Sequence, residues 1–114
     1  MEIQMDNNKT EDIAKLNDEF RKDFSKGMLM LSQGIHLNTV EDIDKIISLV
    51  RNYKTFKRNN DPYGEHDFGS FEYKKKKIFW KIDYYDNDLI HFSPDAADPT
   101  QTTRVLTIMY AEEY

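Results

Sequence analysis

The chain contains no cysteine. Disulfides, thiolate metal sites and cysteine nucleophiles are therefore excluded at once. Only four residues are glycine and three are proline, and the phosphate-binding patterns G-x-G-x-x-G and G-x-x-x-x-G-K do not occur. The serine-hydrolase pattern G-x-S-x-G and the zinc pattern H-E-x-x-H are also missing. No apolar run approaches the roughly 20 residues of a membrane span, and the polar, acidic start of the chain predicts that it carries no Sec signal peptide.

What the sequence does contain is the composition of one small globular domain. Of its 114 residues, 39% are hydrophobic and 32% are charged. This balance predicts a single folded domain over residues 1–114, with one modest core and no need of covalent staples. Residues 1–9 are expected to form a flexible N-terminal tail.

The net charge of −5 is distributed unevenly along the chain. Residues 1–24 are net acidic, basic clusters follow at residues 51–58 and 74–81, and residues 83–98 hold aspartates without any lysine or arginine. Such zones suit the docking of a protein partner through complementary potential, although a chance pattern on a solvated surface explains them equally well. The overall negative sign argues against nucleic acid as the main partner.

Two segments have the periodicity of amphipathic helices. The first is expected over residues 10–24, with Thr10 as its N-cap and Gly27 beyond its end. The second is expected to begin at Asn38, which has capping-box spacing to Glu41. The apolar stripes at three- and four-residue spacing are Ile13, Leu16, Phe20 and Phe24 in the first helix, and Val40, Ile43, Ile46, Ile47, Val50 and Tyr53 in the second.

Four shorter segments are predicted as strands: a short buried one at residues 28–32, and others at 68–73, 77–85 and 104–111. Apolar residues on both faces of 104–111 predict a central strand. The element order α-β-α-β-β-β predicts an α+β, two-layer fold, with two helices on one face of an antiparallel sheet of about four strands. Alternation in the third segment places Ile78, Trp80, Ile82 and Tyr84 on one face and Phe79, Lys81 and Asp83 on the other.

Residues 59–71, NNDPYGEHDFGSF, concentrate acidic, imidazole, amide and aromatic groups. Three interpretations are open. His66 could be a general base tuned by Glu65 or Asp67, His66 and nearby carboxylates could ligate a metal, or the polar groups could satisfy the backbone of a tight turn. In an extended chain His66 points away from its two acidic neighbours, which favours the structural interpretation.

Aromatic residues and lysines alternate in FWKIDYYD, residues 79–86. Stacking of nucleic-acid bases on outward aromatics is one interpretation, and burial of Trp80 and Tyr84 in the core with local hydrogen bonds is the favoured one. The preceding lysines are expected at a hairpin tip, where they keep an edge soluble or contact an acidic partner. The candidate partner-binding residues are Tyr63, His66, Asp67, Lys74, Lys75, Lys76, Lys77, Phe79 and Tyr85.

The strings NNDPYGEHDFGSF, FWKIDYYD, SPDAADPT and TRVLTIMYAEEY resemble a family of small bacterial proteins of unknown function, from about residue 17 to residue 114. The family usually has proline where Ala96 stands. The chain also resembles small Legionella effectors that inhibit the ubiquitin-directed deamidase and transglutaminase effectors MavC and MvcA. That resemblance implies a non-enzymatic, dimeric inhibitor that occupies the surface which ubiquitin needs, and it carries over no catalytic residues.

The leading hypothesis is therefore a protein-binding inhibitor or regulator without catalytic residues, metal or cofactor, located in the bacterial cytoplasm or, as a secreted effector, in the host cytoplasm. The alternatives are a small hydrolase or metal-dependent enzyme centred on His66, and a nucleic-acid-binding module. The enzyme alternative requires a cleft around His66 with a converging carboxylate or second histidine. A homodimer is also expected, because the predicted sheet has at least one edge strand and residues 28–31 form an apolar run.

Overall fold

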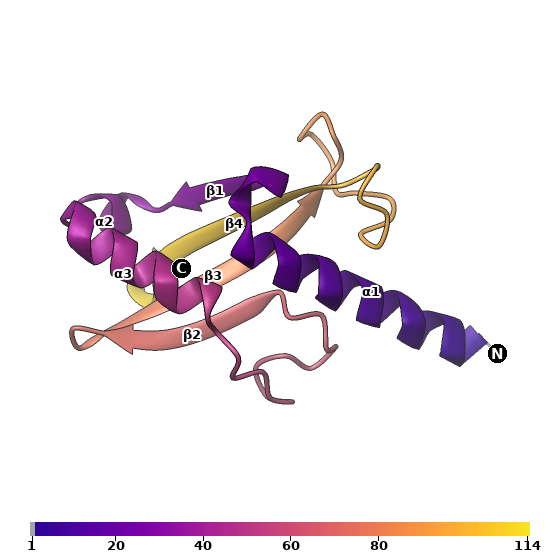
Figure 1. Cartoon of the computed structure of the whole chain (residues 1–114), viewed down its shortest axis with the longest axis horizontal. Coiled ribbons are helices and arrows are strands. Elements are labelled where there is room, and N and C mark those ends of the chain that lie inside the picture. Colours follow the sequence, from indigo (N-terminus) through magenta and orange to yellow (C-terminus); the bar gives the residue numbers. More distant parts are fainter. Residues whose placement is uncertain (1) are drawn as a thin grey trace.

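The computed structural model describes residues 2–114, with side chains described from Lys9 onward. The elements follow the order α1 (Glu2–Lys22), η1 (Phe24–Lys26), β1 (Met28–Leu31), α2 (Gln33–His36), α3 (Val40–Arg51), β2 (Phe68–Tyr73), β3 (Lys76–Tyr85), β4 (Thr103–Tyr110) and η2 (Ala111–Glu113). The fold is α+β, with a four-stranded sheet in the order β1-β4-β3-β2 and its main helices on one face (Figure 1). The predicted fold class and the central position of β4 are confirmed.

The sheet is mixed rather than purely antiparallel, which corrects the prediction. β2 pairs antiparallel with β3, and β3 antiparallel with β4, but β1 runs parallel to β4 with Met28 opposite Val105. A parallel pair needs a long crossover connection, and here most of the domain lies between the two strands. β1 is also only half-buried, because Met28 and Met30 are 39% and 46% exposed.

The helix boundaries differ from the predicted ones at both N-termini. α1 begins at Glu2 rather than after a Thr10 cap, and it ends at Lys22, before the short η1 turn that Gly27 closes. The flexible tail expected over residues 1–9 stays a prediction, because most side chains of this segment lie outside the described part of the chain. In α3 the N-cap is Thr39, whose hydroxyl accepts a hydrogen bond from the Asp42 amide, rather than Asn38.

The single-turn helix α2 was not predicted, and it explains what Asn38 does instead. The Asn38 side-chain amide donates to the backbone carbonyls of Gly34 and Ile35 in α2 and to the Tyr110 hydroxyl on β4. Asn38 therefore ties the α2–α3 connection to the sheet.

The core lies between the helices and one face of the sheet. Phe20 from α1 and Ile46 and Val50 from α3 are almost fully buried against the predicted inward residues of β3 and β4. Trp80 is fully buried opposite Gly69 of β2, and a Cβ at Gly69 would lie 2.4 Å from the Trp80 indole nitrogen. That nitrogen has no hydrogen-bond partner among the described residues, so the local hydrogen bond expected for Trp80 is not formed.

The other face of the sheet carries none of the main helices. Side chains alternate along a strand, so the residues next to the buried Ile78, Trp80 and Ile82 point to this outer side. The Phe79 ring contacts Phe68 at 5.2 Å and Tyr114 at 5.7 Å between centroids. The open face, as we call it, consists of Met28, Met30, Phe68, Phe79, Met109 and Tyr114 around one ion pair, Lys81–Asp83.

Candidate functional site

The DPYGEHD loop, residues 61–67, is built around the side chain of Asp61. Asp61 is only 8% exposed, and its carboxylate accepts a hydrogen bond from the His66 amide. The Gly64 amide donates to the Asp61 carbonyl, which closes a tight turn. Gly64 and His66 both adopt positive φ, 73° and 57°. The non-glycine residue His66 is therefore held in the sparsely populated left-handed region by its surroundings.

This left-handed conformation turns the His66 ring toward α1. His66 Nδ1 lies 3.0 Å from one carboxylate oxygen of Asp18 and 3.1 Å from the other. The Phe56 ring stacks on the imidazole, with centroids 4.0 Å apart and planes 3° from parallel. His66 Nε2 lies 3.8 Å from the Asp61 carboxylate, too far for a hydrogen bond.

Asp18 also links His66 to Arg21, which is 4% exposed. Arg21 Nη2 donates to Asp18 over 2.8 Å, and Arg21 Nη1 donates to the backbone carbonyls of Val50 and Tyr53 over 2.9 and 3.0 Å. The guanidinium therefore donates to two carbonyls at and just beyond the end of α3, where the Val50 carbonyl also accepts from the Tyr53 amide. It joins the two main helices and the loop.

A second polar cluster lies on the other side of the loop. Asn17 is fully buried; its side-chain amide donates to the Glu65 carbonyl and to the Tyr84 hydroxyl. The Tyr84 hydroxyl donates to the Glu65 carboxylate over 2.8 Å, and Arg104 Nε donates to Asn17 Oδ1 over 2.7 Å. Burial raises the pKa of Tyr84. The side chain of Tyr84 is thus partly buried against the core and makes local hydrogen bonds, close to the favoured interpretation.

Burial also raises the pKa of Asp67, to about 6, and the neighbouring charge of Glu65 adds to the effect. Glu65 and Asp67 therefore lie close to one another while His66 faces Asp18 and Phe56. The three consecutive residues divide between the two polar clusters. Within the described part of the chain, no group of three or more His, Asp or Glu side chains is arranged to hold a metal ion.

The other candidate partner-binding residues lie in separate places. Tyr63 is 80% exposed on the loop. The lysine run forms the tip of the β2–β3 hairpin, at the end of the sheet away from the loop, and Lys74 and Lys75 adopt positive φ there. Three of the four lysines have partners: Lys74 pairs with Asp42, Lys76 with Glu112, and the Lys77 ammonium lies over the Phe79 ring.

Of the two outward aromatics, Phe79 lies on the open face, and Tyr85 stacks on Phe92 at the end of β3 that is nearer the loop. The predicted set therefore does not form one site. The structure divides it between the loop, the hairpin tip and the outer side of the sheet.

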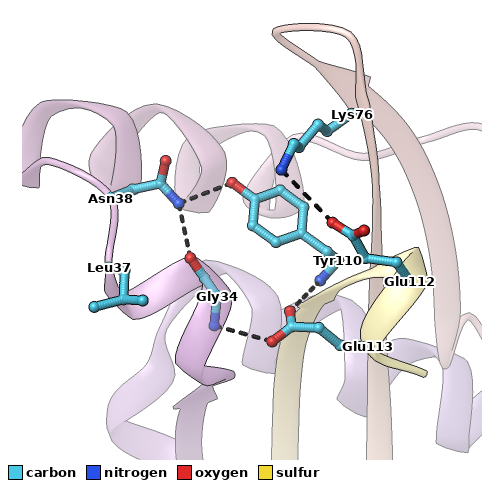
Figure 2. A pocket seen from close by; sticks show the side chains of 7 residues that line it. All are labelled: Gly34, Leu37, Asn38, Lys76, Tyr110, Glu112 and Glu113. Atoms are coloured by element: carbon cyan, nitrogen blue, oxygen red, sulfur yellow. Dashed lines mark hydrogen bonds and ion pairs between the residues drawn. The ribbon is translucent and has the colours of Figure 1, made fainter.

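A shallow hollow near the C-terminus holds a set of internal contacts rather than free groups (Figure 2). The Glu113 carboxylate accepts hydrogen bonds from the Ser32 hydroxyl, the Gly34 amide and the Tyr110 amide, all within 2.9 Å. These bonds lower the pKa of Glu113. This Glu113 latch fastens η2 to the start of α2.

The residues that the sequence analysis missed are the partners of the loop: Asn17, Asp18, Arg21 and Arg104. A signal was present for two of them. Asn17 follows Ile13 by four positions, and Arg21 follows Asn17 by four, so both share the side of α1 that packs on the sheet. Two long polar side chains on a buried helix side indicate buried partners, but they do not identify those partners.

These features define a small two-layer α+β domain with a polar cluster where α1, α3 and the loop meet, and with an uncovered apolar sheet face. The chain belongs to the DUF3768 family of proteins of unknown function, whose pattern matches residues 9–113. This match confirms the family resemblance carried by the long strings. No curated protein and no solved structure matches the chain significantly. None of the helices in the described residues combines the length and the hydropathy that crossing a membrane requires.

Proposed function

We propose that this protein is a non-enzymatic, protein-binding regulator whose partner docks on the open face. The observation that carries the proposal is the exposure of large apolar side chains there: Met28 is 39%, Met30 46% and Tyr114 80% exposed. Exposed apolar surface marks sites of interaction with other molecules, protein partners among them. Aromatic and methionine side chains are also enriched in such interfaces.

The charge of the open face supports a protein partner over nucleic acid. Lys81 and Asp83 neutralise each other across 3.0 Å, and Lys77, whose ammonium lies over the Phe79 ring, is opposite the acidic Glu72 in the β2–β3 pair. A nucleic-acid surface needs unpaired cations to displace counterions from the phosphates. A neutral apolar face instead fits a partner that has an apolar docking patch of its own. It therefore favours a protein partner over a nucleic-acid partner.

The partner that the sequence resemblance favours is a ubiquitin-directed deamidase or transglutaminase, blocked at its ubiquitin-binding surface. Calorimetric titration of the protein into each enzyme tests this partner. Met30→Lys combined with Tyr114→Lys should weaken binding at least about tenfold, because both changes place a charge in an apolar contact. Leu49→Lys combined with Leu37→Lys is the matched control: these residues are 42% and 77% exposed but belong to the helical side.

Absence of binding at micromolar concentration would remove this partner. Equal loss in the test and control variants would remove the open face as the docking surface. Light scattering on every variant keeps self-association apart from partner binding. If the open-face variant loses only self-association, the occupant of the face is a second copy and the proposal fails.

A second candidate function is hydrolysis with His66 as general base. The observation that favours it is the Asp18–His66 pair at 3.0 Å, which lines a cavity of about 380 Å³ and so supplies both the cleft and the carboxylate that an enzyme requires. The test is the variant His66→Gln. If it abolishes a hydrolytic activity of this protein but still binds the deamidase or transglutaminase, the function is catalysis and not regulation.

A further inference from the structure

The cavity beside His66 lies where the C-terminal ends of α1 and α3 meet. It has a volume of about 380 Å³ and is lined from α1, from α3 and from the segment that follows α3. Cavities of this size accept small molecules rather than protein surfaces. The stacked rings of Phe56 and His66 form one wall.

Its lining is strongly basic in a protein whose net charge is −5. Four cations line it, Arg21, Lys22, Arg51 and Lys54, against one carboxylate, Asp18. We call this cavity the basic pocket. Asp18 is already shared between Arg21 and His66, so it cannot balance the other cations.

Lys22, Arg51 and Lys54 form no ion pair within the described side chains, Lys9 to Tyr114. Arg51 makes one cation–π contact, with Phe24 at 5.0 Å. The three cations therefore lie at one cavity without a direct ion-pair partner among the described side chains; the carboxylate of Asp23 acts on Arg51 only at longer range.

Helix capping does not account for them. Basic residues at a helix C-terminus interact favourably with its unpaired carbonyls, but at the end of α3 Arg21 already donates to the carbonyls of Val50 and Tyr53. Lys54 lies beyond the α3 C-cap, Asn52. The cavity therefore holds more cations than are needed to interact with the carbonyls at the helix ends. Mutual repulsion makes such a cluster of cations unfavourable unless an anion binds there.

We propose that the basic pocket binds a phosphate group carried by a small molecule. Arg51 supplies a planar fork that matches two phosphate oxygens, and Lys22 and Lys54 supply point charges. The charge of buried Arg21 is balanced by Asp18 at 2.8 Å, so the attraction for an anion comes from Lys22, Arg51 and Lys54. The site differs from the open face and does not depend on the proposed protein partner.

The experiment is calorimetric titration of the 114-residue chain with inorganic pyrophosphate and, separately, with adenosine monophosphate, at an ionic strength of about 50 mM where screening is weak. Saturable binding is expected. Arg51→Gln combined with Lys54→Gln should weaken it at least about tenfold, because two charge-assisted contacts are lost. The matched control is Lys57→Gln with Arg58→Gln, two exposed cations of the same sequence cluster that do not line the pocket; it should change affinity less than about twofold.

Tighter binding of the nucleotide would show that the Phe56–His66 wall contacts the base, and equal binding would show that the phosphate alone is recognised. Either result requires NMR shift changes at the amides of residues 51–56 and His66 upon titration. No saturable binding of either probe, an equal loss in the control variant, or shifts confined to other residues would each overturn the proposal. Lys22→Gln tests the same site independently of any folding defect in the double variant.

Discussion

At the scale of single residues, burial rather than sequence spacing determines what the acidic side chains of the loop do. Asp61, Glu65 and Asp67 are close in sequence, yet Asp61 closes the turn and Glu65 binds the Tyr84 hydroxyl. Asp67 has a raised pKa, about 6, because of its burial and its acidic neighbours. The ionised carboxylate of Asp67 is therefore a source of instability at neutral pH.

Asp67→Asn is expected to stabilise the protein at pH 7.5 by about 1–2 kcal/mol, a value reduced to allow for partial solvent screening. The folded-state pKa, about 6, lies above the ordinary 3.8. Between these values the folded state binds more protons than the unfolded state, so the free energy of unfolding falls as pH rises through this window. The increase in the free energy of unfolding caused by Asp67→Asn should be full above about pH 6 and vanish near pH 4. Urea denaturation across pH 4–8 measures it.

The control for this prediction has the opposite sign. Hydrogen bonds from Gln101 and Thr100 lower the pKa of Asp98, so Asp98→Asn should destabilise the protein at neutral pH. A stability gain for Asp67→Asn that is the same at pH 4 and pH 7.5 would contradict the titration argument.

At the scale of elements, polar side chains fasten the short pieces that have little apolar surface of their own. Arg21 joins α1 to the end of α3, and Asn38 joins the α2–α3 connection to β4. The Glu113 latch holds η2 against α2 in the same way. Helices as short as α2 and η2 are not stable alone, so their positions depend on these contacts.

Glu113→Gln is expected to lower the free energy of unfolding at pH 7 by about 1 kcal/mol, because three hydrogen bonds lose their charged acceptor. The pKa of Glu113 is lowered from 4.5 in the folded state. Its stabilisation is therefore present above about pH 4.5 and lost as pH falls below that value. Thermal unfolding of the variant and the parent should differ at pH 7 and converge in acid.

Glu112→Gln is the neighbouring control. The Glu112 carboxylate lies 3.6 Å from the exposed ammonium of Lys76, and such surface pairs contribute little to stability. If both variants lose the same stability, the hydrogen bonds of Glu113 have no special role.

At the scale of the whole molecule, the sheet leaves both an apolar face and two edges unpaired within the described chain. β1 and β2 are the edge strands. β2 contains the acidic Glu72, whereas β1, with the sequence MLML, contains no charged residue or proline that would discourage pairing with a second chain. β1 is therefore the edge where self-association is expected.

Light scattering should show a mass twice the 13.6 kDa of the chain as concentration rises into the high micromolar range. Leu29→Pro removes a backbone donor from the edge strand and should keep the protein monomeric, while Ser70→Pro on β2 serves as the comparison edge. A monomer mass at every concentration would refute dimerisation, which stays a prediction until then.

Local pattern was enough to predict most of the elements. The alternation in residues 77–85 identified Ile78, Trp80 and Ile82 as core, and the apolar residues on both faces of β4 identified it as a central strand. Both predictions succeeded because the spacing of apolar residues indicates whether one face of a strand is buried or both. Helix starts were less predictable, since several side chains near each start are able to cap. Asn38 and Thr39 compete for one cap, and contact with Tyr110 directs Asn38 elsewhere.

The sequence by itself determined the class of the fold, the inward face of each long strand and the membership in the DUF3768 family. Only the tertiary structure decided that β1 runs parallel to β4 and that Asp18 meets His66, 48 residues away. The absence of cysteine excluded one kind of chemistry, but it could not show that basic residues from three segments line one cavity. The physical reason is that periodicity reports only which side of an element is buried, whereas the partner of each buried or charged group depends on how distant elements pack.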